Sequence, residues 1–223
     1  MTKRVLVVLS GGQDSTTCLF LAISRYGAGN VFAIGFDYGQ RHKAELECAR
    51  DICRQQQVHF EVIQTPIINE LTSNALTRGE ITVESTETKQ DPPNTFVEGR
   101  NLLFLSYAAI YAKNQGIQHI MAGVSETDFS GYPDCRDIFI KSLNVTLNLA
   151  MNYDFVLETP LMWLNKAQVW QLADELDALD IIKNQTLTCY NGIRGEGCKD
   201  CPACTLRRKG YVEYLRGEMD CTK

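Results

Sequence analysis

The chain has 223 residues, of which 44% are hydrophobic, and its 22 Lys and Arg against 27 Asp and Glu give a net charge of −5. These values predict one globular domain with at most a small appendage, and they exclude the disordered, collagen-like and membrane-spanning classes. Proteins that bind nucleic acid directly need Lys and Arg in excess on one face, so the acidic balance argues against that class of partner.

Glycines interrupt the first apolar run soon after residue 9, which makes that run too short for a secretory signal. No apolar stretch approaches the ~18 residues that a membrane-spanning helix needs. We therefore expect a cytoplasmic protein with no membrane contact. In such a reducing compartment, clustered cysteines bind metal or do chemistry more often than they form disulfides.

Apolar runs alternate with amphipathic segments along most of the chain. Strands are expected at 4–9, 31–38, 58–64, 119–124 and 154–158. Helices are expected at 14–26, 41–56, 102–112 and 138–151, and one more begins after a capping box formed by Asn165 and Gln168. This alternation predicts an α/β fold with a doubly wound, mostly parallel sheet of about five strands.

Two segments depart from this alternation. Residues 72–95 are polar, and only Ile81 and Val83 suggest buried contacts. A loop of this length is typical of a lid, a partner contact or a disordered segment, and it makes a homodimer our expectation. Beyond residue 180 the chain becomes rich in Gly and Cys. We therefore divide the chain into an α/β domain at 1–180 and a zinc-binding C-terminal segment at 181–223.

The first predicted strand is followed by Ser10-Gly11-Gly12-Gln13-Asp14-Ser15-Thr16 and then by a helix. Glycines let the backbone turn tightly against an anion, and N–H groups at a helix N-terminus donate hydrogen bonds to it. The loop has neither the Lys of G-x-x-x-x-G-K-[ST] nor the spacing of G-x-G-x-x-G. It is typical of a phosphate-binding loop, although a Gly-Gly turn with a capping Asp or Ser has a similar composition.

The string Ser-Gly-Gly-x-Asp-Ser resembles the pyrophosphate-binding loop (PP-loop) of the ATP pyrophosphatase superfamily. The resemblance implies an adenine nucleotide alpha hydrolase-like fold, cleavage of ATP between the α- and β-phosphates, and Mg²⁺ bound with ATP. It implies ATP binding by Leu9, Ser10, Gly11, Gly12, Gln13, Asp14, Ser15 and Thr16. Catalytic roles fall to Ser10, Asp14 and Ser15. Asp14 is equally well explained as a residue that places Mg²⁺ or as a helix cap.

Four of the nine cysteines lie in one short segment, namely Cys189, Cys198, Cys201 and Cys204. Paired C-x-x-C spacing lets neighbouring sulfurs converge on one ion, and four thiolates suit a closed, structural zinc site with one zinc per chain. An iron–sulfur cluster is the alternative, because C-x2-C-x2-C also opens a ferredoxin-type motif. Zinc is favoured because the fourth ligand lies upstream. The simplest interpretation of Cys18, Cys48 and Cys53 is that they are helix or core residues.

The segment after the fourth predicted strand carries carboxylates, aromatic residues and an arginine at the carboxyl end of the sheet. A solvated turn has this composition too. However, Phe129 or Tyr132 could stack on a flat heterocycle, and Glu126, Asp128 or Asp134 could accept N–H groups from a guanine-like edge.

The whole string 126–136, together with Gly99-Arg100-Asn101 and Thr188-Cys189-Tyr190-Asn191-Gly192, resembles the 7-cyano-7-deazaguanine synthases. The similarity extends from Arg4 to about Leu215. One departure is Glu98, which stands where the family usually has Pro, so the stiffness of that loop differs from the family pattern.

This resemblance implies an ATP-dependent ligase of queuosine biosynthesis. Such an enzyme converts 7-carboxy-7-deazaguanine and ammonia into the nitrile through an adenylated carboxylate and an adenylated amide, and it releases AMP and pyrophosphate. The resemblance implies substrate binding by Arg100, Asn101, Glu126, Asp128, Tyr132, Asp134 and Arg136, with Arg100 also catalytic. Lys141 and Lys166 could also contact the α-phosphate or carboxylate, but surface charge explains them better.

Two alternative functions stay open from the sequence. Another adenylating PP-loop enzyme, either an amidating synthetase or a tRNA thiolase, would share the loop, although the acidic charge argues against tRNA. A zinc-ribbon module would share the cysteines and contact nucleic acid through Arg207, Arg208 and Arg216. Charges that favour the C-terminal end of a helix explain these arginines more simply.

Overall fold

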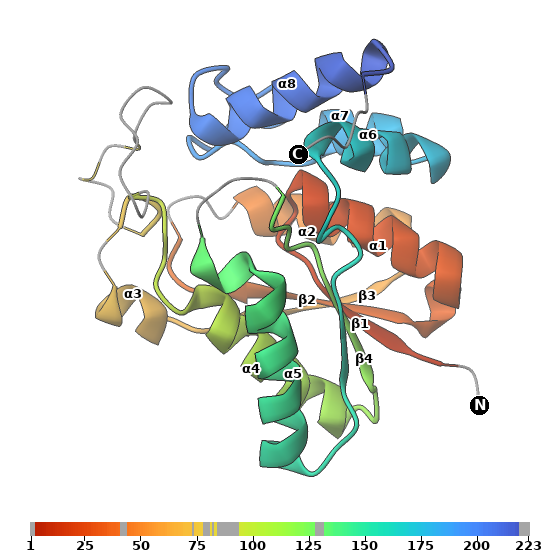
Figure 1. Cartoon of the computed structure of the whole chain (residues 1–223), viewed down its shortest axis with the longest axis vertical. Helices are drawn as coiled ribbons and strands as arrows, with labels where there is room; N and C mark the ends of the chain where they lie inside the picture. Colours follow the sequence, from red (N-terminus) through yellow and green to blue (C-terminus); the bar gives the residue numbers. More distant parts are fainter. Residues whose placement is uncertain are drawn as a thin grey trace.

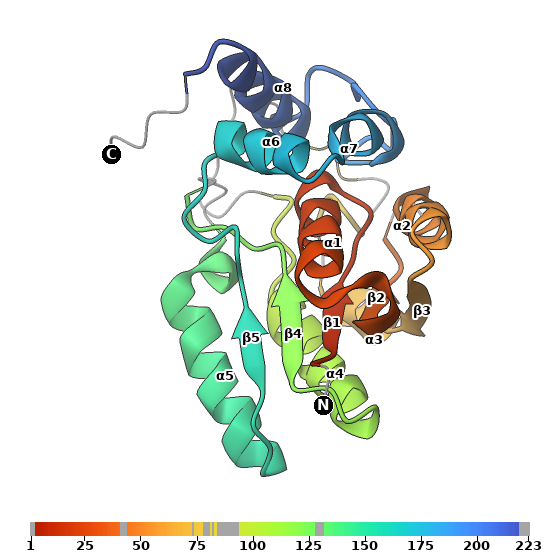
Figure 2. The ribbon, with the colours of Figure 1, turned by 90° about the vertical axis from the view of Figure 1, so that its right-hand side faces the viewer.

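The computed structural model of the chain describes residues 3–40, 44–72, 74–77, 81, 83, 94–127 and 132–218. Its centre is a sheet of five parallel strands in the order β3-β2-β1-β4-β5 (Figure 1; Figure 2). The strands are β1 (Val5–Val8), β2 (Val31–Asp37), β3 (His59–Gln64), β4 (His119–Ala122) and β5 (Val156–Glu158). Because the strand order reverses at β1, the loops after β1 and β4 diverge and leave a crevice at the carboxyl end of the sheet.

The predicted doubly wound α/β fold is confirmed, and every expected strand is present with ends that differ by one or two residues. The capping box is also confirmed. The side chain of Asn165 accepts the N–H of Gln168 at 2.9 Å, and the side chain of Gln168 accepts the N–H of Asn165 at 2.9 Å. Both signals are local in sequence, which is why they could be recognised without tertiary information.

Helices cover both faces of the sheet (Figure 2). They are α1 (Gln13–Tyr26), α2 (Ala44–Gln55), α4 (Arg100–Asn114), α5 (Asp137–Met151), α6 (Lys166–Glu175) and α7 (Leu179–Gln185). Val5 and Val7 pack into a core shared with α1, α2, α6 and α7, whereas Leu6 and Ile34 pack against α4 and α5. Burial on both faces explains why β1 is an uninterrupted apolar run.

Helix α8 (Pro202–Leu215) packs against α6 on the side away from the sheet, uppermost in Figure 1. A Cβ on Gly210 would lie 2.4 Å from the Cβ of Lys166 and 2.8 Å from its carbonyl carbon. The indole N–H of Trp170 donates to the carbonyl oxygen of Arg207 at 3.1 Å. The backbones of the two helices are therefore in contact where α6 and α8 cross.

Several elements were not predicted from the sequence. These are α7, the short helix α3 (Ile67–Leu71) and the 3-10 turns η1 (Ala28–Asn30) and η2 (Pro133–Cys135), while for α8 the sequence indicated a helix without its bounds. The domain boundary predicted at residue 180 falls inside α7. Within the described ranges, every helix falls short of the length and apolarity that a membrane span requires.

Part of the segment at 72–95 is packed against the fold. The side chain of Asn74 accepts two backbone N–H groups at 3.0 and 3.2 Å, and Ala75 donates to a carbonyl across the loop at 2.9 Å. Asn74 and Ala75 are buried, so the expectation that only Ile81 and Val83 make buried contacts is wrong. Most of the remaining segment lies outside the described residues.

We expect Gly210→Ala to lower the free energy of unfolding by about 1–2 kcal/mol, because the added methyl group forces α8 away from α6. This loss exceeds the helix propensity that Ala contributes relative to Gly, which is at most about 1 kcal/mol. Thermal and urea unfolding measure the change. Gly29→Ala is the control, since nothing lies within 4 Å of a Cβ at Gly29. An unchanged melting temperature in Gly210→Ala would contradict the backbone contact.

Candidate active site and metal centre

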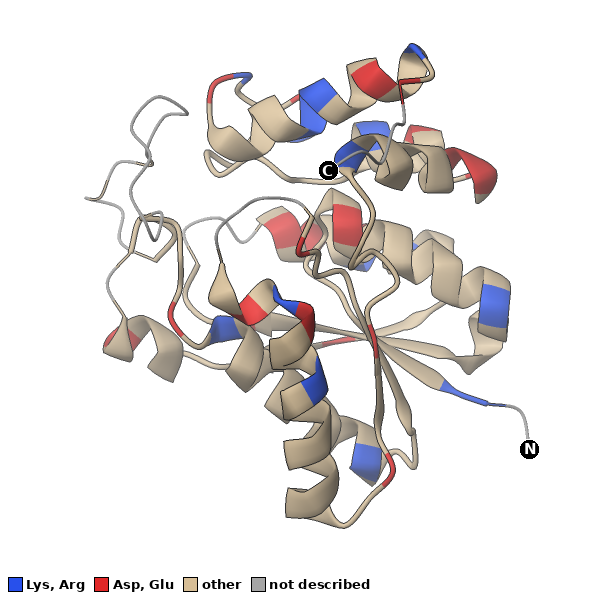
Figure 3. Cartoon of the chain, in the orientation of Figure 1, with Lys and Arg blue, Asp and Glu red and all other residues tan. Residues whose placement is uncertain are grey.

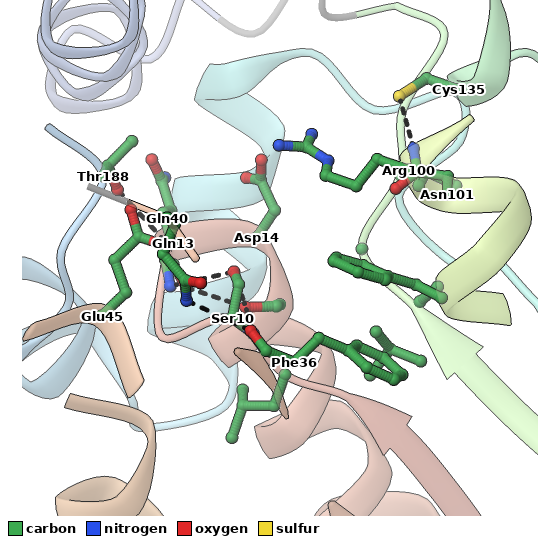
Figure 4. Close-up of a pocket in the computed structure, with 18 of the residues that line it drawn as sticks. Ser10, Gln13, Asp14, Phe36, Gln40, Glu45, Arg100, Asn101, Cys135 and Thr188 are labelled. Carbon is green, nitrogen blue, oxygen red and sulfur yellow. Dashed lines mark hydrogen bonds between the residues drawn. The ribbon is translucent and has the colours of Figure 1, made fainter. Parts of the chain in front are cut away.

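A cavity of about 310 Å³ opens at the carboxyl end of the sheet (Figure 4). Its walls come from the phosphate loop, the end of β2 with the first turn of α2, the first turns of α4, the end of β4, and residues 187–190. These segments are far apart in the sequence and meet where the strand order reverses. The cavity therefore occupies the crevice that the doubly wound topology predicts.

The phosphate loop is ordered by its own hydroxyl groups. Ser10 Oγ and Ser15 Oγ lie 3.0 Å apart, and the N–H of Gly12 donates to Ser10 Oγ at 3.4 Å. Helix α1 begins after Gly12 without a side-chain cap, and no described residue accepts the N–H of Asp14 or Ser15. These groups are left for an anion, which the positive end of the helix dipole also favours.

The loop packs closely against the first turn of α2. Gly11 has a φ of +86°, and a Cβ there would lie 2.1 Å from the carbonyl oxygen of Glu45, so the position requires glycine. Six of the predicted ATP-binding residues line the cavity: Leu9, Ser10, Gly12, Gln13, Asp14 and Ser15. Gly11 and Thr16 are not part of the lining, and Thr16 is fully buried in α1.

Asp14 is paired with a buried lysine. Lys166, only 7% exposed, donates from Nζ to both carboxylate oxygens of Asp14 at 2.8 Å. The prediction that Lys166 is a surface charge is therefore wrong, whereas Lys141 is 73% exposed and pairs with Asp137 as a surface residue. Asp14 does not cap α1, because its side chain is directed to Lys166 instead.

Arg100 lies across the cavity from the loop, and Figure 4 shows its guanidinium pointing toward Asp14. Gly99, with a φ of +71°, turns the chain into α4 so that Arg100 is the first helical residue. Burial alone would lower the pKa of Arg100, but Tyr38, Tyr132 and Asp134 raise it above its ordinary value. Arg100 is therefore a permanent cation that faces the phosphate loop.

Next to Arg100, Asn101 is fixed by the segment that follows β4. Its backbone N–H donates to the carboxylate of Asp134 at 3.1 Å, and its side chain donates to the Asp134 carbonyl at 3.2 Å and to Cys135 Sγ at 3.4 Å. Phe36 and Phe104 stack with centroids 4.2 Å apart and form an apolar part of the wall. A flat ring can therefore pack beside a cationic and an amide group.

The predicted substrate-binding residues divide into two groups. Arg100, Asn101 and Tyr132 line the cavity, and the buried Asp134 holds Asn101 from behind. Glu126 and Arg136 are not brought to the cavity. The carboxylate of Glu126 accepts the N–H of Asp137 at 2.9 Å at the start of α5, and Arg136 is exposed at the N-cap of that helix. Asp128 lies outside the described residues.

The cavity also contains residues that the sequence analysis missed, including Tyr38, Gln40, Glu45, Cys135 and Thr188. Glu45 stands out because no described residue donates a hydrogen bond to its carboxylate, and burial raises its pKa to about 7 although Arg100 acts to lower it. The amide of Gln13, only 1% exposed, also has no described hydrogen-bond partner. Glu45 follows the end of β2 by eight residues, and that position at the carboxyl edge of the sheet was the available signal.

The four predicted metal ligands converge. The sulfur atoms of Cys189, Cys198, Cys201 and Cys204 all lie within 4.8 Å of one another, and those of Cys198 and Cys204 are 3.9 Å apart. Tetrahedral zinc with Zn–S bonds of about 2.3 Å requires sulfurs about 3.8 Å apart, so the set fits such an ion. The structure confirms a candidate metal site, while the identity of the metal stays a prediction.

The surroundings of the four sulfurs suit bound thiolates. Backbone N–H groups of Asn191 and Cys201 donate to the sulfurs of Cys189 and Cys198 at 3.3 Å. Gly197 has a φ of +68°, and a Cβ there would lie 2.2 Å from Cys204 Sγ. Cys18, Cys48 and Cys53 are buried helix residues, as predicted, and Cys221 lies outside the described residues.

The fold relates the chain to a solved 4-thiouridine synthetase–RNA complex with bound ATP. The two chains are 14% identical with a TM-score of 0.53, and the match covers 98% of this chain and 53% of that chain. This likeness, together with the parallel five-stranded sheet and the helices on both of its faces, confirms the predicted doubly wound α/β fold.

The chain belongs to the family of the queuosine biosynthesis protein QueC, whose model matches residues 4–215. A protein of Clostridium acetobutylicum is 62% identical over 214 residues, which cover 96% of both chains. A protein of Clostridium botulinum is 58% identical over 212 residues, which cover 95% of this chain and 96% of the relative. Both relatives are named 7-cyano-7-deazaguanine synthase, so the family resemblance seen in the sequence is confirmed.

We expect Glu45→Gln to change how stability depends on pH. Burial raises the pKa of Glu45 to about 7 in the folded chain, whereas an exposed Glu titrates near 4.3. Between these values the unfolded chain has lost the proton that the folded chain keeps, so the wild-type protein loses stability as pH rises through this window. The melting temperature of Glu45→Gln relative to wild type should therefore increase from about pH 5 to about pH 8 and then level off.

Thermal unfolding of the ligand-free protein at a series of pH values measures this difference. The same substitution at the exposed Glu98 is the matched control for the loss of one carboxylate outside the cavity. A difference that stays constant with pH for Glu45→Gln would contradict the raised pKa.

Proposed function

We propose that the chain is an ATP-dependent ligase that converts 7-carboxy-7-deazaguanine and ammonia into 7-cyano-7-deazaguanine, with release of AMP and pyrophosphate. The observation that carries this proposal is a single cavity with a phosphate-binding loop on one side and Arg100, Asn101 and aromatic side chains on the other. The names of the relatives support the same product.

ATP places its β- and γ-phosphates on the loop. The N–H groups at the start of α1 and the hydroxyls of Ser10 and Ser15 donate to these phosphates and retain pyrophosphate as its bond to the α-phosphate breaks. Asp14, oriented by Lys166 at 2.8 Å, is the loop carboxylate suited to hold the Mg²⁺ that accompanies ATP. That ion would share the charge of the departing pyrophosphate.

The deazaguanine packs on the other side of the cavity. Arg100 orients the substrate carboxylate toward the α-phosphate, because a guanidinium binds a carboxylate through two parallel hydrogen bonds. The heterocycle lies beside the stacked rings of Phe36 and Phe104, within reach of the side chains of Asn101 and Tyr132. Binding both partners in one cavity replaces an encounter in solution by a fixed geometry.

The reaction uses this geometry twice. First a carboxylate oxygen attacks the α-phosphate, pyrophosphate leaves, and ammonia then displaces AMP to give the primary amide. Next the amide oxygen attacks the α-phosphate of a second ATP and a second pyrophosphate leaves. Loss of AMP and of the two N–H protons from the adenylated amide then gives the nitrile. Neither step needs a covalent enzyme intermediate. This agrees with Cys135, since burial raises its thiol pKa to about 12 and keeps it protonated.

The cysteine cluster is proposed to hold one structural zinc, because four protein ligands leave no open position for a substrate. A cytoplasmic homodimer completes the proposal. The exposed side chains of Ile138, Val145 and Leu149 lie along one stripe of α5 and support a dimer.

The alternative of a nucleic-acid-binding zinc ribbon is disfavoured. Arg207, one of its three arginines, is only 5% exposed and cannot contact a phosphate backbone. It also lies in the middle of α8, so the expectation that it is a charge at the end of a helix is wrong. Figure 3 shows Lys and Arg interspersed with Asp and Glu along the helices rather than gathered on one element.

We expect the purified chain, incubated with ATP, ammonia and 7-carboxy-7-deazaguanine, to form the nitrile and to release AMP and pyrophosphate in equal amounts. Arg100→Met should lose most of this turnover, because its side chain keeps a similar length without the charge that orients the carboxylate. Product mass and nucleotide analysis measure the reaction. Lys141→Met, at an exposed residue, is the control. Release of ADP, or no turnover by the wild-type protein, would overturn the assignment.

We expect the protein to be colourless and to contain about one zinc per chain, and Cys201→Ser to remove that zinc and lower the melting temperature. Cys48→Ala, at a buried thiol on α2 outside the cluster, should keep the metal. Metal analysis and the absorption spectrum decide the identity. A brown protein with visible absorption would contradict zinc and indicate an iron–sulfur cluster.

A further inference from the structure

Residues 187–190 form a wall of the cavity that the PP-loop motif does not include. Leu187 donates its N–H to the carbonyl oxygen of Gly11 at 2.9 Å, and Thr188 Oγ1 accepts the N–H of Gln13 at 3.3 Å. Figure 4 shows Thr188 next to Gln13, and both residues line the cavity with Tyr190. This segment is therefore held against the phosphate loop by two hydrogen bonds, and Thr188 lies at the N-terminus of α1.

A buried arginine holds Thr188 from behind. Arg207 Nη1 donates to Thr188 Oγ1 at 2.7 Å and to Thr186 Oγ1 at 2.8 Å, and Nη2 donates to the carbonyl oxygens of Ile182 at 2.6 Å and Lys183 at 3.1 Å. No carboxylate among the described residues lies within ion-pair distance of this guanidinium. Burial lowers the pKa of Arg207 to about 10, so it remains a cation at neutral pH.

The hydrogen bonds of Thr188 leave one group unused. A hydroxyl oxygen has two acceptor lone pairs and one proton. Gln13 and Arg207 occupy both lone pairs, and no described residue accepts the proton. Because Thr188 lines the cavity, its hydroxyl is left as a donor toward whatever binds at the phosphate loop.

We propose that Thr188 is a further phosphate-binding residue, which donates its hydroxyl to a pyrophosphate oxygen of ATP, and that Arg207 is the positioning residue that fixes and polarises this hydroxyl. The inference rests on the proposed function, because it assumes that the loop binds the β- and γ-phosphates. The positive charge of Arg207 polarises the Thr188 hydroxyl and makes it a stronger hydrogen-bond donor to a phosphate at the loop. The loop thereby gains this effect without a Lys of its own. Since Cys189 follows Thr188, the metal-binding segment thereby contributes to the ATP site.

The test measures the affinity of the full chain, with its metal content verified, for inorganic pyrophosphate with Mg²⁺ by titration calorimetry. Thr188→Val keeps the shape and removes the hydroxyl, and it should raise the dissociation constant roughly 10–100-fold, as for loss of a hydrogen bond to a charged group. Thr188→Ser restores the hydroxyl and should stay within about threefold of wild type. Thr186→Val is the matched control, because Thr186 also accepts from Arg207 but is fully buried outside the cavity.

The role of Arg207 has its own readout. Arg207→Met should weaken pyrophosphate binding in the wild-type background and add little in the Thr188→Val background, because both changes remove the same interaction. A purely structural role for Arg207 would instead weaken binding by the same factor in both backgrounds. If Arg207→Met does not fold, Thr188→Val against Thr188→Ser still decides the role of Thr188.

Equal pyrophosphate affinity of Thr188→Val and wild type would overturn the inference, while nitrile formation by the wild-type protein would leave the proposed function intact. Conversely, a wild-type protein that binds pyrophosphate through Thr188 but forms no nitrile would overturn the proposed function alone. A wild-type protein that neither binds pyrophosphate nor forms the nitrile would overturn both.

Discussion

The close packing of backbone around the N-terminus of α1 is the constraint on which the site depends. A Cβ on Gly11 would strike the carbonyl oxygen of Glu45 at 2.1 Å, and a Cβ on Gly123 would lie 2.8 Å from the backbone of Asp14 and Ser15. On a third side, Leu187 hydrogen-bonds to the loop carbonyl of Gly11. Helix α2, the end of β4 and residues 187–190 are therefore all positioned against the same few peptide groups. A change in any one of them moves the donors that face the cavity.

The same packing sets the electrostatic balance of the cavity. The chain as a whole has a net charge of −5, yet the charged groups around the loop include the three cations Arg100, Lys166 and Arg207 and the two carboxylates Asp14 and Glu45. Lys166 pairs with Asp14, and burial leaves Glu45 partly protonated near neutral pH. This balance of charge suits the triphosphate and the carboxylate of the proposed reaction, which an acidic surface would repel. Burial of the cations also keeps them from attracting larger polyanions.

The sequence predicted those features that depend on residues close together in the chain. Strand order aside, the alternation of apolar and amphipathic segments was enough for the fold class, and the capping box of Asn165 and the cysteine cluster are patterns with short spacing. Prediction from the sequence was wrong for charged residues that are buried by an element far away in the chain. Lys and Arg are usually surface residues. Lys166 and Arg207 are buried only because α6 and α8 cross over the loop. Glu126 was misassigned because it caps α5 rather than facing the cavity.

The position of the metal centre follows from the same constraint. Residues 186–201 contain no helix or strand, and the apolar cluster around the cysteines is small. Such a segment cannot bury enough apolar surface to hold a fixed conformation by itself, and the proposed metal would provide the missing order. The segment nevertheless includes Thr188 and Tyr190, which face the cavity. A metal held by Cys189 would therefore lie beside the proposed ATP site, where it would stabilise the wall that hydrogen-bonds to the phosphate loop. Its four thiolates would leave it no part in the chemistry.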